Sequence, residues 1–303
     1  MRFVIAIGGN ALLKRGEPLS AANQARNMAK SAFGLAQICA GQEVAIVHGN
    51  GPQVGLLALE AALYKEVPPY PFDVLGAESQ GMIGYVIAQA MRNALPGREV
   101  AALLTQTLVD VGDAAFKRPT KPIGPMYNET EITAMKLPSD WHFAADGPYK
   151  RRVVPSPMPL EILELAAIKC LVAANVLTIC CGGGGIPVIM DVRAGSIEKT
   201  TGVEAVIDKD LASALLAIKL DADHLIILTD VDGIYAEWMQ PGQRLLRSTT
   251  VTELQTLDFA EGSMGPKVEA ACRFVRETGK QVFIGNLQAA SAVVSGAAGT
   301  RVC

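Results

Sequence analysis

Residues 204–218 read EAVIDKDLASALLAI and place three charged residues, Asp208, Lys209 and Asp210, between two apolar stretches. Good helix formers follow the triplet and apolar residues recur at helical spacing, so we expect a helix that begins at or just after it. The N–H groups and the dipole of a helix N-terminus attract anions, and Lys209 would add a full positive charge there. The aspartates could hold Lys209 or bind a metal that accompanies a phosphate. Alternatively, Asp208 is only an N-cap and Lys209 a solvated residue of the first turn.

The totals of the chain limit the classes of protein to consider. Its 303 residues are enough for one large α/β domain or for two lobes. Lys and Arg number 27 against 30 Asp and Glu, so the net charge of -3 gives no sign of a nucleic-acid partner. No apolar run approaches the roughly 18 residues of a membrane span, and Gly8 and Gly9 interrupt the first run too early for a signal peptide. We therefore expect a cytoplasmic protein with no membrane or nucleic-acid partner.

The cysteines and histidines give no sign of a metal site. None of the six cysteines forms a CxxC motif and most lie in apolar patterns, so a reduced and mostly buried set is expected. The histidines are too scattered for a zinc site to be expected: His48, His142 and His224.

Apolar periodicity predicts alternating strands and helices, which is typical of an α/β protein with a parallel sheet. Apart from the helix after the triplet, the expected strands are residues 3–7, 43–48, 100–109, 176–181, 224–229 and 281–284, and the expected helices are 20–40, 52–65, 78–95, 160–173 and 266–278.

The first two predicted strands both end in turns of glycine and asparagine. Gly8-Gly9-Asn10 follows the first strand, and Gly49-Asn50-Gly51 follows the second. Ligands of open parallel sheets bind beyond the carboxyl ends of the strands, where both turns would lie. Each could also be a simple strand-to-helix turn, but two at one edge favour a binding site.

Four consecutive glycines, Gly182–Gly185, follow the strand at 176–181 and offer unobstructed backbone donors. The run does not fit the dinucleotide pattern G-x-G-x-x-G, because Ile186-Pro187-Val188 is typical of more strand instead of a helix start. It also lacks the terminal Lys-Ser/Thr of a P-loop. A Rossmann dehydrogenase and a P-loop ATPase are therefore disfavoured.

Residues 112–159 differ in character from the rest of the chain, with eight prolines and few long apolar runs. We expect an inserted flap or small subdomain, because long irregular segments in compact proteins are usually functional or disordered. Its basic residues could reach an anionic ligand or could simply be solvated: Lys117, Arg118, Lys121, Lys150, Arg151 and Arg152.

Charged residues follow the strands and begin the helices in the second half of the chain, whereas glycine and asparagine form the turns in the first half. Asp230 and Asp232 follow the strand at 224–229 and could touch a nucleotide and metal or cap a turn. Pro266 fits a first helical turn, which places Lys267 near the positive end of a helix, as for Lys209. This division indicates a small acceptor on the N-terminal side and a polyphosphate on the C-terminal side.

Taken together, these motifs resemble the amino acid kinase superfamily and, within it, the carbamate kinase family. Eight blocks that span essentially the whole chain carry the resemblance: residues 8–12, 48–55, 78–84, 119–125, 152–157, 182–188, 204–210 and 262–268. The block at 119–125 and its flap resemble carbamate kinases more than acetylglutamate, aspartate or uridylate kinases. The resemblance implies one domain over 1–303, a three-layer α/β/α sandwich on a mainly parallel sheet with a flap subdomain at 112–159.

The resemblance also implies the reaction: carbamate and MgATP give carbamoyl phosphate and MgADP, reversibly. Relatives often run towards ATP in the breakdown of arginine, agmatine or purine-derived ureides, usually as homodimers. Mg²⁺ would be held mainly by phosphate oxygens, so no metal ligand of the protein is assigned with certainty. Phosphoryl transfer to an anionic carbamate oxygen needs no general base, which fits the absence of a Ser/His/Asp set.

Residue roles follow from the same resemblance. Lys209 and Lys267 match lysines on the transferring phosphoryl group, Asp210 the aspartate that holds them, and Lys121 a flap lysine that closes on the site. The small-substrate side comprises Gly8, Gly9, Asn10, Gly49, Asn50 and Gly51. The expected nucleotide side comprises Gly183, Gly184, Asp208, Asp230, Tyr235, Met264 and Val268.

Two other functions stay open at this point. A kinase for another small carboxylate-like acceptor would be favoured by a charged side chain in the first-half turns, which contain none. A sensor that binds a nucleotide or carbamoyl phosphate without turnover would be favoured by loss of Lys209, Asp210 or Lys267, and all three are present.

Overall fold

A computed structural model describes residues 1–14, 16–134, 141–191, 199–260 and 263–303. Its central sheet has eight strands in the order β15-β17-β16-β12-β1-β2-β9-β3. The six strands from β16 to β3 are mutually parallel, and β17, which lies between β16 and the edge strand β15, runs antiparallel to β16. The strands are β1 (Arg2–Ile7), β2 (Glu43–His48), β3 (Val100–Ala102), β9 (Leu177–Ile179), β12 (His224–Thr229), β15 (Ser248–Thr249), β16 (Val282–Asn286) and β17 (Thr300–Val302).

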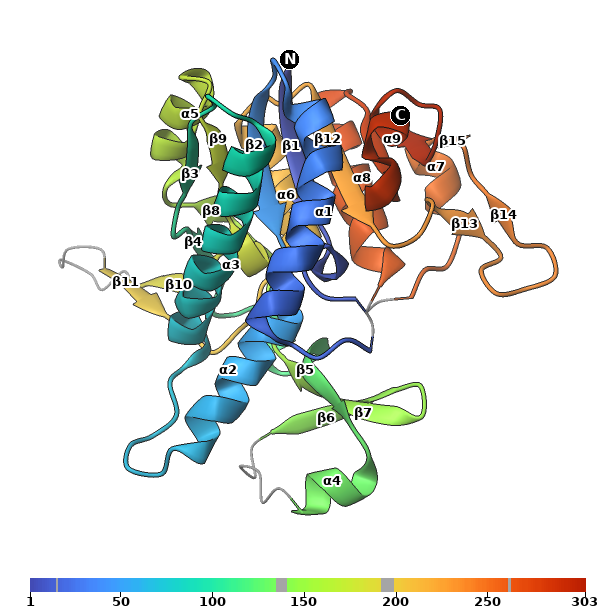
Figure 1. The fold of residues 1–303 in the computed structure, drawn as a ribbon. Coiled ribbons are helices and arrows are strands. Elements are labelled where there is room, and N and C mark those ends of the chain that lie inside the picture. The colour runs from blue at the N-terminus through green and yellow to red at the C-terminus, as the bar shows by residue number, and fades with distance from the viewer. Residues whose placement is uncertain (15, 135–140, 192–198, 261–262) are drawn as a thin grey trace.

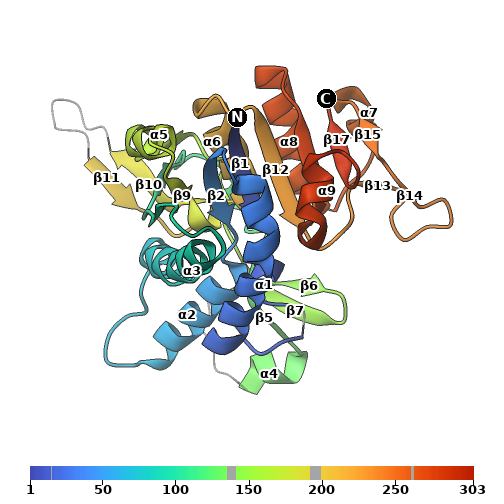
Figure 2. The same ribbon diagram turned by 45° about the horizontal axis from the view of Figure 1, so that its top comes forward.

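Helices cover both faces of this sheet and make a three-layer α/β/α sandwich (Figures 1 and 2). Successive strand side chains point to opposite faces, so Val4 and Ala6 of β1 pack under one layer while Ile5 and Ile7 pack under the other. The first layer contains α5 (Leu165–Ala173), α6 (Lys209–Lys219), α7 (Val251–Leu254) and α8 (Met264–Thr278), and the second contains α1 (Ala21–Cys39), α3 (Phe72–Ala94) and α9 (Ala290–Val294). The fold class expected from the sequence is therefore confirmed.

A second sheet of four strands, in the order β11-β10-β4-β8, lies beside the first. It consists of β4 (Gln106–Leu108), β8 (Glu161–Ile162), β10 (Ile186–Asp191) and β11 (Lys199–Gly202). The strand expected at 100–109 is therefore wrong as one element, because it splits into β3 and β4. Between the two strands, the side chain of Gln80 accepts a hydrogen bond from Thr105 N at 2.8 Å and donates one to Thr105 O at 3.1 Å. The backbone of Thr105 therefore has hydrogen-bond partners although this residue belongs to neither strand.

Several helix boundaries also differ from the expectation. α3 begins at Phe72 and not at Glu78, because Phe72 is buried and Leu75 N donates a hydrogen bond to Pro71 O, which closes an additional turn. The helix expected from Leu160 begins at Leu165, because Glu161 and Ile162 pair with β4 as β8. No helix among the described residues is long and apolar enough to cross a membrane.

The flap sheet, residues 121–154, projects below the carboxyl ends of the central strands (Figure 1). Its strands are β5 (Lys121–Tyr127), β6 (His142–Asp146) and β7 (Tyr149–Val154), with β7 in the middle and α4 (Glu129–Ala134) in the connection. β5 packs on α2 (Gly51–Leu63) so closely that a Cβ on Gly55 would overlap the Cα of Gly124. Glycine is therefore required where the flap meets the body.

The remaining elements are short. A hairpin of β13 (Tyr235–Ala236) and β14 (Arg244–Leu245) follows β12, and single 3-10 turns lie at η1 (Gly9–Ala11), η2 (Ala114–Phe116), η3 (Gly182–Gly184) and η4 (Leu287–Ala289). All six cysteines are free thiols; four are buried, whereas Cys170 and Cys303 are exposed.

Candidate active site

The two glycine turns lie side by side at the carboxyl edge of the central sheet. Strands β1 and β2 are parallel and in register, with Ile7 opposite His48, so their turns begin at the same level. Gly49 N donates a hydrogen bond to Ile7 O at 3.1 Å. A Cβ on Gly49 would lie 3.4 Å from Gly9 N and 3.5 Å from Lys209 Cε. The turns therefore leave space for the lysine to reach them; the side chain of Asn10 lies outside the described part.

Asp208 caps the helix that carries the catalytic candidates. Its Oδ1 accepts a hydrogen bond from Asp210 N at 2.8 Å, and its Oδ2 lies 2.6 Å from Lys121 Nζ of the flap. Burial alone would raise the pKa of Asp208, but the charge of Lys121 lowers it below the usual value. Both carboxylate oxygens are thus engaged with the protein itself, and the expected contact of Asp208 with a nucleotide stays a prediction.

Asp210 holds the two lysines expected at the phosphoryl group. One carboxylate oxygen lies 2.7 Å from Lys209 Nζ and the other 3.2 Å from Lys267 Nζ. The Asp210 side chain is only 3% exposed. Burial opposes its ionisation, yet the charges of Lys209 and Lys267 hold the pKa of Asp210 well below its usual range. The carboxylate is therefore ionised and fixes both ammonium groups at one point.

The pKa values of Lys209 and Lys267 shift in opposite directions, although both lysines contact Asp210. Burial lowers the pKa of Lys209, and the charge of Asp210 only partly offsets this. Burial acts in the same direction on Lys267, but the charges of Asp210, Asp208 and Asp230 together raise its pKa. The difference has a structural cause, because the Lys209 side chain is the more deeply buried of the two, at 12% exposed against 16%. We therefore expect Lys209 to gain most from a nearby anion.

A cavity of about 330 Å³ adjoins Lys267 on the C-terminal side. Three of the residues expected on the nucleotide side line it, Asp230, Tyr235 and Met264, together with Lys267. The aromatic residues Trp238 and Phe259 also line it and were not predicted, and the rings of Tyr235 and Trp238 are 5.1 Å apart. The full lining is Thr229, Asp230, Val231, Gly233, Tyr235, Trp238, Asp258, Phe259, Ala260, Ser263, Met264 and Lys267. Val268, also expected here, is a residue of α8 whose side chain is buried in the core.

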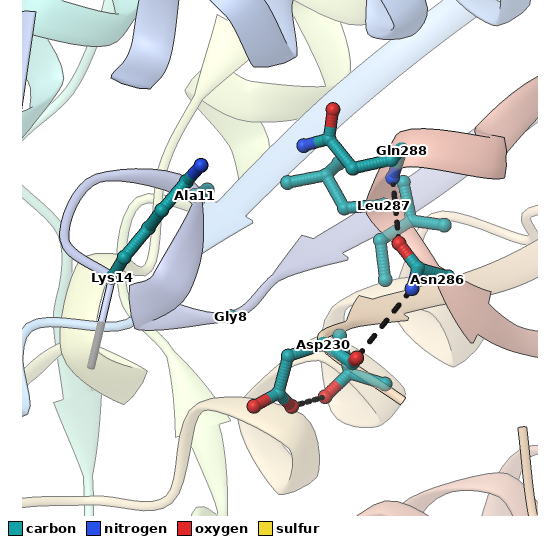
Figure 3. A pocket seen from close by; sticks show the side chains of 9 residues that line it. Gly8, Ala11, Lys14, Asp230, Asn286, Leu287 and Gln288 are labelled. Atoms are coloured by element: carbon teal, nitrogen blue, oxygen red, sulfur yellow. Dashed lines mark hydrogen bonds between the residues drawn. The ribbon is translucent and has the colours of Figure 1, made fainter. Parts of the chain in front are cut away.

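A second cavity, of about 270 Å³, extends from Asp230 to Gly8 (Figure 3). In Figure 3 Asn286 lies between Asp230 and Gln288, with its Oδ1 accepting a hydrogen bond from Gln288 N at 2.9 Å. Thr229 and Asp230 line both cavities, so the aromatic cavity and the one at the first glycine turn lie on either side of these two residues. Lys14 and Asn286 also line this space and were not predicted.

The glycine run supports the other half of the site. A Cβ on Gly183 would overlap the side chain of Asn50, and one on Gly184 would lie 2.7 Å from Ile207 O. Both glycines are buried and have positive φ, 64° and 93°, which residues with side chains rarely adopt. Gly183 and Gly184 therefore shape the small-substrate turn and the segment before Asp208. Neither lines the Tyr235 cavity, and their expected place on the nucleotide side stays a prediction.

The comparison with known proteins matches this arrangement. The model of the amino acid kinase family covers residues 1–286. The chain belongs to the amino acid kinase family. Carbamate kinase from Haemophilus influenzae is 50% identical over 303 residues, which cover 100% of this chain and 96% of the relative. Carbamate kinase from Escherichia coli K12 is 49% identical, with coverage of 99% and 98%.

Solved structures of the family show the same fold. Carbamate kinase from Giardia lamblia bound to AMP-PNP superposes with a TM-score of 0.87 at 42% identity, over 99% of this chain and 98% of that chain. Its citrate-bound form gives a TM-score of 0.90 at 42% identity, over 99% and 97%. The similarity to carbamate kinases therefore includes both halves of the site and the flap.

Magnesium fits the C-terminal half of this kinase site. The described residues contain no cluster of three His, Cys, Asp or Glu side chains that could hold a metal alone. Mg²⁺ in kinases is usually held by one or two carboxylates together with substrate phosphates. Asp230, shared by both cavities, supplies such a carboxylate, and the hydroxyl of Thr229 lies 3.1 Å from its Oδ1.

His48 is a site residue that sequence analysis did not assign. It is 1% exposed at the end of β2, and its Nδ1 lies 3.1 Å from Gly49 O. Because a carbonyl oxygen only accepts, Nδ1 must carry the proton and donate. Burial, with a contribution from the charge of Lys209, lowers the pKa of His48 to about 4. A lone histidine in a predicted strand does not show that its side chain will be buried near Lys209, because the fold alone brings these two residues together.

The neutral His48 should make the protein sensitive to acid. Its folded pKa of about 4 lies below the roughly 6.5 of an unfolded histidine, so the unfolded state binds the extra proton first. Stability is then complete above pH 6.5 and falls as the pH drops towards 4, by about 3 kcal/mol. Urea unfolding at pH 7 and pH 4 should show that His48→Asn removes this part of the pH dependence. The exposed His142→Asn is the control, and equal pH dependence in both variants would contradict the role of burial.

Lys121→Ala should lower kcat about 10- to 100-fold, because one positive donor at the site is lost. The fold should persist, since Asp208 keeps its hydrogen bonds to α6. Coupled measurement of ATP formation tests this, with the exposed flap variant Lys117→Ala as the control. Unchanged kcat and KM in Lys121→Ala would show that the flap lysine takes no part in turnover.

Proposed function

We propose that this chain is a carbamate kinase, which transfers a phosphoryl group reversibly between ATP and carbamate. One observation carries the proposal: Asp210 holds Lys209 and Lys267 together between the paired glycine turns and the aromatic cavity. The full-length similarity to carbamate kinases supports it. We further propose that the reaction runs towards ATP in the cell, in line with the family resemblance.

In this proposal the protein supplies position and charge, with little covalent chemistry of its own. Lys121, Lys209 and Lys267 oppose Asp208 and Asp210, which leaves one excess positive charge for the transferring phosphoryl group. Phosphoryl transfer depends on such charge at the equatorial oxygens and on in-line placement of the reacting atoms. The carbamate oxygen is already an anion, so no side chain has to remove a proton from it.

The two halves of the site divide the substrates. The N–H groups of Gly8 and Gly49 donate to Leu228 O and Ile7 O, so the later N–H groups of the two turns would orient carbamate or carbamoyl phosphate through fixed dipoles. The cavity of Tyr235 and Trp238 would hold the base of ATP or ADP, with Asp230 near the phosphates. Mg²⁺, when bound, would neutralise charge on the phosphate oxygens, and Asp230 would hold it from the protein side.

The test is ATP formation from ADP and carbamoyl phosphate with Mg²⁺, with acetyl phosphate as the control donor. Rapid ATP formation specific to carbamoyl phosphate is expected. Equal use of acetyl phosphate would favour a kinase for another carboxylate-like acceptor. Tight ADP binding without ATP formation would favour a sensor.

We also propose a homodimer formed through α3. Val74, Met82 and Tyr85 are spaced to share one face of this helix, and all three are exposed, Tyr85 by 64%. Light scattering should give twice the mass of the chain, and Tyr85→Lys should shift the mass towards the monomer. A monomeric wild type would contradict the proposal. The six free thiols support a reducing, cytoplasmic location.

A further inference from the structure

Arg152 of the flap lies between an aromatic ring of the flap and one of the body. Its Cζ is 3.5 Å from the ring centroid of Trp141 and 4.7 Å from that of Phe72. Trp141 directly precedes β6, whereas Phe72 is the first residue of α3 and is 4% exposed. A guanidinium over an aromatic face is attracted by the ring quadrupole, and its planar shape lets it stack on a ring at each side. Arg152 therefore joins the flap to the body.

The strand that carries Arg152 also sets the place of the flap lysine. β7 is the middle strand of the flap sheet, and its Val154 pairs with Lys121 while Arg152 pairs with Ile123. Residues two apart on a strand share a face, so Arg152 and Val154 lie on the same side of β7. A shift of Arg152 along or across β7 would thus be transmitted to Lys121 through three consecutive pairs of the same ladder.

The body side of this contact leads back to the lysine–aspartate cluster. Phe72, Val154 and Val206 belong to one small apolar cluster between flap and body. Phe72 N donates a hydrogen bond to Glu204 Oε1 at 3.3 Å, and Val206 N donates one to Pro155 O at 2.9 Å. Both bonds are made by residues 204–206, a segment that ends two positions before Asp208. The partner of Lys121 and the ring that holds Arg152 are therefore fixed by the same segment.

A cavity of about 510 Å³ lies beside the contact, with Phe72, Trp141 and Arg152 all in its wall. Beside Arg152, space takes the place of the close packing found where Gly55 of α2 meets Gly124 of β5. The position of the outer flap consequently depends on the stacked Arg152 more than it would if the space were filled.

We infer that Arg152, held between Phe72 and Trp141, is a positioning residue that sets where Lys121 lies over the active site. This inference rests on the proposed function and on the role of Lys121 in it. We expect the effect of Arg152 on catalysis to act through the lysine that it positions.

The test is a double-mutant cycle on the full chain, with ATP formation from ADP and carbamoyl phosphate as the readout. Arg152→Ala should lower kcat about tenfold in the wild type, because small displacements of a catalytic group are costly, while KM for ADP stays unchanged. In the Lys121→Ala background the same substitution should have almost no further effect. Arg152→Lys, which keeps the charge but loses the planar group, should fall between wild type and Arg152→Ala.

Two further variants keep the test decisive. Arg151→Ala is the matched control, since Arg151 lies on the opposite side of β7 and pairs with Asp146 within the flap, and it should leave kcat unchanged. Trp141→Leu removes one ring without altering any charge and should reproduce the kcat loss and its dependence on Lys121, even if Arg152→Ala does not fold. An equal loss of kcat with and without Lys121, or no loss at all, would overturn the inference while leaving the proposed function intact. Absence of ATP formation by the wild type would overturn both.

Discussion

Lys209→Ala is expected to lower kcat for ATP formation about 10²- to 10³-fold, the scale found when one preorganised donor to a transition state is removed. The lysine lies between its carboxylate partner Asp210, at 2.7 Å, and the second glycine turn, whereas Lys267 is held at the other oxygen of Asp210. Because burial lowers the pKa of Lys209, an anionic phosphoryl group would stabilise its charged form strongly. The interaction should thus strengthen as charge develops in the transition state.

The control for this prediction lies on the same helix. Lys219 is exposed at the C-terminal end of α6, so Lys219→Ala removes the same charge and side chain ten residues away from the site. Steady-state kinetics should show a change in kcat only for Lys209→Ala, with a smaller change in KM for ADP. Similar kcat values for the two variants would remove Lys209 from the chemistry.

The helix starts that carry the lysines could be predicted because their signals are local. Asp208 caps α6 through its own side chain, and the apolar period after it belongs to the same eleven residues. At the other lysine, Pro266 lies in the first turn of α8 and Gly279 ends the helix with a φ of 69°. Each boundary depends on residues within one helix, which a single sequence displays directly.

The division of residues 100–109 between two sheets could not be predicted in this way. It depends on Gln80, which is 25 residues from Thr105 and satisfies both backbone groups of that residue. Strands such as β17, with three residues, are too short to show a period. Long-range side-chain bonds and very short strands therefore account for most of the differences in the fold.

In the candidate site, too, the sequence predicts local features better than contacts between distant residues. The charges of Lys209, Asp210 and Lys267 could be assigned, and the structure brings them together. The ion pair of Lys121 with Asp208 joins residues 87 apart and was not foreseen, since Asp208 was assigned to the nucleotide. Trp238 was missed because it lies in a short hairpin loop with no periodic pattern. Partners far apart in the chain are thus the least predictable part of the site.

Asp210→Asn is expected to have the largest combined effect on activity and stability. The amide would leave the buried ammonium groups of Lys209 and Lys267 side by side without their shared counter-charge. Removing one partner of a buried ion pair usually costs about 3–5 kcal/mol, because the remaining charge is left uncompensated. The kcat for ATP formation should also fall by about 10²-fold or more, since both lysines lose the carboxylate that fixes their positions.

An added anion separates this explanation from a general loss of packing. If the defect is uncompensated positive charge, inorganic phosphate or sulfate should raise the unfolding midpoint of Asp210→Asn more than that of the wild type, because the anion binds between the two lysines. Asp221→Asn is the matched control, since this aspartate pairs with Lys280 at 2.5 Å but its side chain is 86% exposed, and its loss should change the unfolding midpoint far less than Asp210→Asn does. Equal stabilisation of all three proteins by the anion would mean that Asp210 serves the packing of α6 and α8 and not the charge of the site. Selective stabilisation of Asp210→Asn would instead identify the space between Lys209 and Lys267 as an anion site, which is the property that phosphoryl transfer requires.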